Sequence, residues 1–81
     1  MALEQALLNI LVCPVDKGGL LYFDDEKLLY NARLHRVYRI RDGIPLMLPQ
    51  RAETSTEAEH VRLLGRARAG EGVRTPAAPG L

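Results

Sequence analysis

The sequence predicts a small α+β domain, with a three-stranded antiparallel sheet flanked by two short helices. The chain has 81 residues, which is enough for one domain with a thin core. Its composition, 47% hydrophobic and 26% charged, is typical of a globular protein. Short apolar and aromatic runs separated by turn residues occupy the middle of the chain, and this pattern predicts strands.

The N-terminal segment predicts a helix and then a loop. From Ala2 to Leu11, leucine and isoleucine recur at spacings of three and four, which suits one short amphipathic helix. Pro14 ends this helix, and the following Gly18 and Gly19 break regular structure. We therefore expect a loop or knuckle over Val12–Gly19.

Three strands are predicted next. Leu20–Phe23 and Lys27–Tyr30 are rich in apolar and aromatic residues and are joined by three consecutive acidic residues, which predicts a hairpin with a tight, solvated turn. Leu34–Arg41 supplies the third strand. Its residues alternate between two faces, with Tyr38 and Ile40 on one of them. We expect the other face to be mostly solvated.

The strongest turn signal follows the third strand, at Asp42 and Gly43. Gly43 permits a positive φ, and Asp42 can form a hydrogen bond with the backbone ahead of it. Pro45 holds Ile44 extended and removes a hydrogen-bond donor. An apolar run closed by a second proline comes next. The segment contains no nucleophile with a base, so we expect it to present a surface.

A second helix is predicted after this run. Thr54 and Thr56 each have a glutamate three residues later, as in a capping box, and the helix is expected to end at Gly65. Beyond it the chain is rich in Arg, Ala, Gly and Pro and has too little apolar surface to offset the entropy of ordering. We therefore divide the chain into a domain over residues 1–65 and a disordered, dispensable tail over residues 66–81.

The net charge and the cysteine count argue against several classes of protein. The formal net charge of +1 argues against general binding to phosphate backbones, which usually needs a basic excess. One cysteine cannot form an intramolecular disulfide, and the N-terminal residues show neither a signal peptide nor an apolar stretch of membrane length. We expect a cytoplasmic protein.

Three stretches together resemble a known family: Leu7–Leu20, Leu29–Tyr30 and Tyr38–Pro45. They resemble the bacterial YcaR-like proteins, short relatives of the small subunit that activates tRNA, rRNA and release-factor methyltransferases. The resemblance covers about residues 3–53 and is specific, because the Cys-Pro-x-x-Lys-Gly and Tyr-x-Ile-Arg-Asp-Gly-Ile-Pro motifs occur in the family's order. It implies a zinc-ribbon-like knuckle and a non-catalytic adaptor that binds an S-adenosylmethionine-dependent methyltransferase as a heterodimer.

Metal-binding members of this family carry four cysteines that bind zinc. In this chain Cys13 falls on the first ligand position, Asp16 on the second, Tyr30 on the third, and the fourth lies near Arg33. Structural zinc needs four nitrogen or sulfur donors, so we expect no metal and no cofactor, and folding of the isolated chain without metal. The alternative is a weaker site made by Cys13, Asp16 and His35.

The sequence offers two further chemical roles. Cys13 would need a base to act as a nucleophile, and the spacing of His35 and His60 recommends neither, so the chain is not predicted to be an enzyme and both histidines are expected at the surface. Alternatively, the basic third strand could make the protein an RNA- or ribosome-associated module, in which arginine and tyrosine stack on bases. The arginines of this arrangement are Arg33, just before the strand, and Arg36, Arg39 and Arg41 within it, with Tyr38 among them.

The partner-binding surface is placed on one tyrosine and on the segment after the third strand. Its predicted residues are Tyr38, Asp42, Gly43, Ile44, Pro45, Leu46, Met47 and Leu48. In an extended chain Ile44, Leu46 and Leu48 would enter the core, and Met47 would point outward to the partner. Met47→Glu should then leave the isolated fold nearly as stable. Alternatively, the second helix covers Met47.

Overall fold

The computed structural model of the protein describes residues 11–75. Their elements are β1 (Leu21–Phe23), the 3-10 turn η1 (Asp24–Glu26), β2 (Leu28–Asn31), β3 (Arg36–Arg41), β4 (Ile44–Pro45), the 3-10 turn η2 (Pro49–Arg51), β5 (Glu53–Thr54), α2 (Glu57–Arg68) and β6 (Val73–Arg74). None of the helices in this range is long and apolar enough to cross a membrane. The first predicted helix lies outside the described residues, apart from Leu11 at its end.

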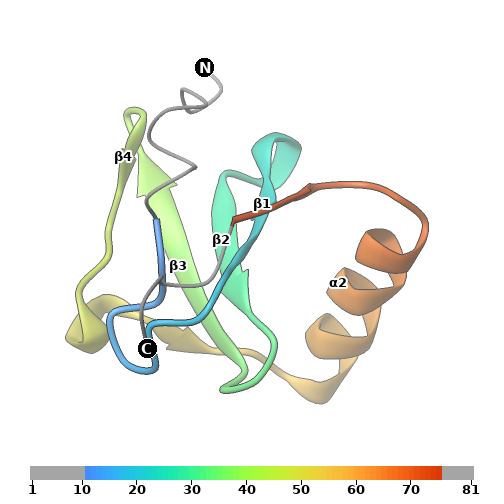
Figure 1. The fold of residues 1–81 in the computed structure, drawn as a ribbon, viewed down its shortest axis with the longest axis horizontal. Helices are drawn as coiled ribbons and strands as arrows, with labels where there is room; N and C mark the ends of the chain where they lie inside the picture. Colours follow the sequence, from blue (N-terminus) through green and yellow to red (C-terminus); the bar gives the residue numbers. More distant parts are fainter. Residues whose placement is uncertain (1–10, 76–81) are drawn as a thin grey trace.

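The strands form one antiparallel sheet in the order β4-β3-β2-β1-β6, and β5 pairs with β3 outside this path. Figure 1 shows the sheet curled, with α2 against one side of it. The predicted central strands are confirmed, since Leu21 lies opposite Tyr30 and Leu29 lies opposite Tyr38. The α+β class is also confirmed. The sheet is larger than predicted because the short strands β4, β5 and β6 pair with it.

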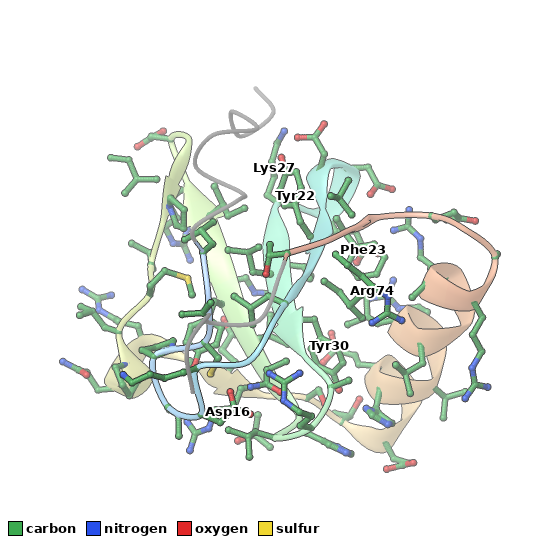
Figure 2. All side chains as sticks on the ribbon, in the orientation of Figure 1. Asp16, Tyr22, Phe23, Lys27, Tyr30 and Arg74 are labelled. Carbon is green, nitrogen blue, oxygen red and sulfur yellow. The ribbon has the colours of Figure 1, made fainter. Side chains whose placement is uncertain are left out.

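Both sides of the sheet are covered by apolar side chains. One side, the loop face, buries Cys13, Leu20, Tyr22, Leu29, Tyr38 and Ile40, with Leu11, Met47 and Ala52 packed against them. The other side, the helix face, buries Leu21, Phe23, Leu28, Tyr30, Val37 and Leu63, with Ala32, Leu64 and Ala67 packed against them. Figure 2 shows Phe23 and Tyr30 between the sheet and α2. The expectation that one face of the third strand is mostly solvated is wrong, because α2 covers Val37.

The helix α2 starts where the sequence predicts and ends later. Thr56 is the N-cap, and its Oγ1 accepts a hydrogen bond of 3.1 Å from the backbone N–H of Glu59, so this one of the two proposed caps is confirmed. The helix then passes through Gly65 and continues to Arg68. A glycine inside a helix costs about 1 kcal/mol relative to alanine, so contacts elsewhere must offset it.

The side chain of Arg66 supplies those contacts. Its guanidinium forms ion pairs with Glu26 of the hairpin turn and with Glu71 beyond the helix, the latter at 2.6 Å. The same group lies 4.9 Å from the centroid of the Phe23 ring, in a cation–π arrangement. The last turn of α2 is therefore tied to the β1–β2 hairpin, which explains why the helix does not stop at Gly65.

The structure differs from the predicted tail over residues 66–81. Most of residues 66–75 lie in α2 and β6, and β6 pairs with β1. Thr75 is only 5% exposed and exchanges two hydrogen bonds with Leu20, one from its backbone N–H at 2.8 Å and one to its Oγ1 at 2.7 Å. The segment is poor in apolar surface, as predicted, but backbone hydrogen bonds to β1 hold it. Residues 76–81 lie outside the described range.

Candidate functional site

The turn between β3 and β4 has the geometry that its sequence predicts. Asp42 and Gly43 have φ values of 52° and 75°, and positive φ at both central residues is characteristic of a type I′ hairpin turn. The chain then pairs back on β3, with Arg41 opposite Ile44. β4 is at one end of the sheet order, and no further strand pairs with it among residues 11–75. Its outer backbone edge is therefore unpaired within this range, where Pro45 offers a carbonyl but no N–H donor.

The exposure of the apolar residues after this turn does not follow the predicted alternation. Ile44 is 63% exposed and Leu48 is 50% exposed, while Met47 is half-buried and packs against the loop face. Pro45 and Leu46 are half-buried. The expected outward direction of Met47 is wrong, because β4 is only two residues long and strict alternation does not continue beyond it. The alternative is also wrong, since α2 covers the other face.

Tyr38, which was predicted to contact a partner, is fully buried. Its hydroxyl lies 3.2 Å from the Sγ atom of Cys13. Burial and this bond to Cys13 raise the pKa of Tyr38 well above its usual value. Burial alone would raise the pKa of the Cys13 thiol, but hydrogen bonds from Tyr38 and from nearby backbone groups outweigh it and lower that pKa. Tyr38 therefore supports the loop face from inside, beneath the segment that carries Met47.

The knuckle is a tight loop closed by backbone hydrogen bonds. The backbone N–H of Cys13 donates to the carbonyl of Gly18 at 2.9 Å, and the N–H of Lys17 donates to the carbonyl of Cys13 at 2.8 Å. A side chain at position 18 would meet the guanidinium of Arg33, because a Cβ atom there would lie 2.2 Å from its Nη2. The glycine of the Cys-Pro-x-x-Lys-Gly motif therefore makes room for that arginine.

The residues on the four zinc positions do not fit a zinc ion. The Asp16 carboxylate accepts hydrogen bonds from Arg33 at 2.8 Å and 3.2 Å, so an arginine cation occupies the place beside the carboxylate that a metal would need. These bonds hold the pKa of Asp16 far below its usual value. Tyr30 faces the opposite side of the sheet. Among the described residues, no three Cys, His, Asp or Glu side chains are grouped to hold a metal, and this includes Cys13, Asp16 and His35. Folding without metal stays a prediction.

A polar cluster on the helix face was missed by the sequence analysis. The Tyr30 hydroxyl lies 2.6 Å from Nδ1 of His60 and 3.0 Å from Oγ of Ser55. The ring of His60 stacks on His35, with centroids 3.9 Å apart and an interplanar angle of 9°. Burial is the main reason that the pKa of Tyr30 is raised. The sequence predicts both histidines at the surface, whereas in the structure both are half-buried. They lie away from Cys13, which belongs to the loop face, so no thiol–imidazole pair forms.

The basic third strand is partly neutralised. Arg39 forms an ion pair of 3.1 Å with Glu53 of β5, and Arg33 is held by the knuckle carboxylate. Arg36 and Arg41 form no ion pair within residues 11–75. Only half of the predicted basic surface therefore carries uncompensated charge.

Comparisons with known proteins place these features in context. A family model described as Trm112p-like protein matches residues 4–43, which include the knuckle, β1 to β3 and the Asp42–Gly43 turn. The chain is 44% identical over 57 residues to a UPF0434 protein of Neisseria meningitidis, an alignment that covers 70% of this chain and 95% of that relative. It is 48% identical over 50 residues to a UPF0434 protein of Gluconobacter oxydans, with 62% and 85% coverage.

A solved structure is also similar. The solution NMR structure of an uncharacterized BCR protein from the Northeast Structural Genomics Consortium superposes with a TM-score of 0.59 at 50% sequence identity. The match covers 69% of this chain and 92% of that protein. These similarities agree with the resemblance drawn from the sequence motifs.

Proposed function

This chain belongs to the Trm112p-like family as a small bacterial member, and we propose that it is a non-catalytic adaptor that binds an S-adenosylmethionine-dependent methyltransferase. The adaptor and the enzyme form a heterodimer, in which the adaptor stabilises or activates the enzyme. The proposal rests on the resemblance to the small subunit that activates tRNA, rRNA and release-factor methyltransferases. In this scheme the adaptor meets nucleic acid only indirectly, through the enzyme.

One observation supports a place for the interface: two large apolar side chains are exposed beside an edge strand. Ile44, which lies in β4, is 63% exposed, and Leu48, three residues after β4, is 50% exposed. An exposed edge strand accepts a further strand through backbone hydrogen bonds, while neighbouring side chains add selectivity. Complete burial of such a side chain contributes about 1.5–3 kcal/mol. We therefore place the partner on Ile44, Leu48 and the backbone of Asp42 and Gly43.

The other predicted surface residues have supporting roles in this proposal. Met47 packs against the loop face and Tyr38 lies within it, so together they hold the segment in place. Pro45 and Leu46 are half-buried and add the remaining contact area. The free, buried Cys13 suits a reducing compartment, and we place the adaptor in the cytoplasm.

The test begins with affinity purification of the tagged chain from its own host, followed by reconstitution with the methyltransferase identified by mass spectrometry. We expect a one-to-one complex by light scattering and tighter binding of S-adenosylmethionine by the enzyme in the complex. Ile44→Asp and Leu48→Asp should each weaken the complex by about tenfold or more, as interface anchors do. Val61→Asp is the matched control, because Val61 is 61% exposed on α2. Equal affinity of all three variants would contradict the placement.

The RNA-binding alternative has one observation in its favour, the uncompensated charge of Arg36 and Arg41. An RNA complex would lose affinity steeply between about 50 and 200 mM salt, because phosphate contacts release counterions. An apolar protein interface would change little over this range. Salt titration of whatever complex is isolated therefore separates the two functions.

A further inference from the structure

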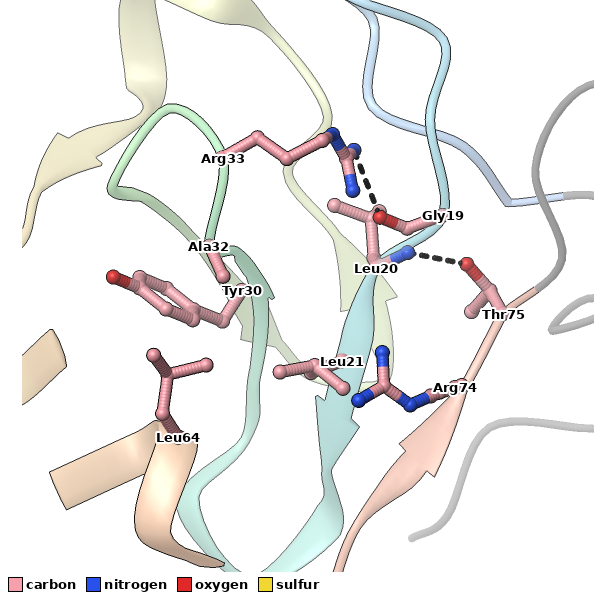
Figure 3. A pocket seen from close by; sticks show the side chains of 9 residues that line it. All are labelled: Gly19, Leu20, Leu21, Tyr30, Ala32, Arg33, Leu64, Arg74 and Thr75. Carbon is pink, nitrogen blue, oxygen red and sulfur yellow. Dashed lines mark hydrogen bonds between the residues drawn. The ribbon is translucent and has the colours of Figure 1, made fainter. Parts of the chain in front are cut away.

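A pocket lies between the sheet and α2, at the end of the molecule where β6 joins β1. Its volume is about 270 Å³. Figure 3 shows Leu64 of α2 and Tyr30 of β2 on one side, Arg74 and Thr75 on the other, and Leu21 between them. The lining combines the apolar side chains of Leu21, Ala32 and Leu64 with the polar groups of Arg33, Arg74 and Thr75. This pocket is separate from the β4 edge and does not depend on the proposed adaptor function.

The two arginines of the pocket differ in charge balance. The guanidinium of Arg33 is held by Asp16 at 2.8 Å and by the carbonyl of Gly19 at 2.9 Å, so its charge is compensated. Arg74 is exposed and forms no hydrogen bond or ion pair with its side chain among the described residues. No acidic residue lines the pocket. Within the described residues it therefore carries one uncompensated positive charge, that of Arg74.

A buried hydroxyl adds a second donor. Thr75 is 5% exposed, and its Oγ1 accepts a hydrogen bond of 2.7 Å from the backbone N–H of Leu20 (Figure 3). A hydroxyl both accepts and donates, and no hydrogen bond donated by the Thr75 hydroxyl is found within residues 11–75. The hydroxyl is oriented by Leu20, and in our proposal its hydrogen is donated to the ligand.

We propose that this pocket binds a small monocarboxylate with a short apolar or aromatic body. The carboxylate accepts hydrogen bonds from the guanidinium of Arg74 and from the Thr75 hydroxyl, since a guanidinium fork suits the two oxygens of a carboxylate. The body of the ligand lies against Leu21, Ala32 and Leu64. At about 30 Å³ for each water-sized group, the volume of about 270 Å³ holds about nine non-hydrogen atoms.

The charge balance favours a carboxylate over a phosphate. A phosphate group carries close to two negative charges at neutral pH, whereas the part of the pocket formed by residues 11–75 offers one free cation, that of Arg74. Burying the second charge of a phosphate without a partner would be unfavourable. A carboxylate matches the single cation, and an attached hydrocarbon group uses the apolar part of the lining.

The first test compares two probes of equal size on the ¹⁵N-labelled full chain, at fixed ionic strength. Benzoate carries the carboxylate, and benzamide is its neutral counterpart with the same number of non-hydrogen atoms. We expect benzoate to shift the amides of Leu21, Leu64 and Thr75, with a Kd in about the millimolar range for so small a ligand. Benzamide should bind about tenfold or more weakly. Equal binding of both probes, or benzoate shifts confined to other amides, would overturn the proposal.

The second test uses a matched pair of arginine variants. Arg74→Gln should weaken benzoate binding by about tenfold or more, because it removes the charge and the fork. Arg68→Gln, at an exposed arginine of α2 outside the pocket, should leave it unchanged. The amide spectrum shows that each variant is folded. Unchanged affinity in Arg74→Gln, or inorganic phosphate binding to the same amides at least as tightly as benzoate, would overturn the assignment.

Discussion

The two faces of the sheet bury side chains of similar size but are covered in different ways. On the helix face, one element supplies the cover: Leu63 is fully buried, and Arg62 and Arg66 tie α2 to Glu26 of the hairpin turn. On the loop face, the cover comes from the knuckle and from the chain after β4, where Met47 is only half-buried. The helix face is therefore closed by the chain itself. Beside the loop face, Ile44 and Leu48 stay exposed at the edge of the sheet.

The family match covers the knuckle and the strands β1 to β3 but not the helix α2. The Trm112p-like match ends at residue 43, so it includes the knuckle that covers the loop face and ends before α2 begins at Glu57. The matched strands β1 to β3 supply buried side chains to both faces. The match includes Asp42 and Gly43 of the proposed partner surface and ends before Ile44 and Leu48, so their role stays a prediction.

The largest loss of stability is expected from a substitution on the helix face. Leu63→Ala removes a fully buried side chain and should lower the free energy of unfolding by about 2–5 kcal/mol, as large-to-small core substitutions do. Val61→Ala on the same helix is the control, and its 61% exposed side chain should cost about 0.5 kcal/mol or less. Urea unfolding measures both. Similar values for the two variants would show that α2 does not close this face.

The next effect is expected on the loop face, at Met47. Met47→Glu places a charge against apolar side chains and should destabilise the isolated domain by about 2 kcal/mol. This reverses the expectation drawn from the sequence, in which the variant was nearly as stable as the parent. Ile44→Glu, at a 63% exposed position, should change stability by about 0.5 kcal/mol or less. If Met47→Glu were the milder change, the loop face would be more open than described.

Substitutions at two glycines, Gly70 and Gly72, test whether β6 is paired with β1 in solution. Gly72 has a φ of 80°, and a Cβ atom there would lie 2.8 Å from Cε1 of Phe23, whereas Gly70 has a φ of 85° with nothing within 4 Å. Gly70→Ala should therefore cost only the left-handed strain, about 1 kcal/mol. Gly72→Ala should cost more, up to about 2 kcal/mol, because it also displaces Phe23. Equal thermal unfolding midpoints would indicate that β6 is detached from β1 in solution.

The smallest change in stability is expected when the pH is lowered. Hydrogen bonds from arginine lower the pKa of Asp16 beside the loop face and of Glu26 beside the helix face, from ordinary values of 3.8 and 4.5. A carboxyl whose pKa is lower when folded stabilises the fold above its ordinary pKa, and that contribution is lost as the pH falls. Each pair is partly exposed, so about 1 kcal/mol or less is at stake.

Unfolding measured at about pH 6 and about pH 3 tests this comparison. Asp16→Asn and Glu26→Gln should each lower stability at the higher pH and flatten its acid dependence, because the titrating carboxyl is gone. An unaltered acid dependence in both variants would assign the effect to other carboxyl groups.

The features that the sequence alone determined are local. The Asp42–Gly43 turn follows from backbone conformations that few residues tolerate, and the Thr56 cap follows from one side chain that bonds to an N–H three residues ahead. The strands β1 to β3 follow from their apolar and aromatic content. Family membership followed from motifs within these same segments. Each signal lies within a few residues of the structure that it specifies, so it can be read without knowing the rest of the fold.

The tertiary structure alone decided the contacts between distant segments. The stack of His35 on His60 and the hydrogen bonds between Leu20 and Thr75 join residues far apart in sequence, and no local pattern marks them. The direction of Met47 was decided in the same way. Alternation along an extended chain applies only where the strand continues, and β4 ends after Pro45. From there the free energy of packing against the loop face, and not the backbone period, determines which side chain is buried.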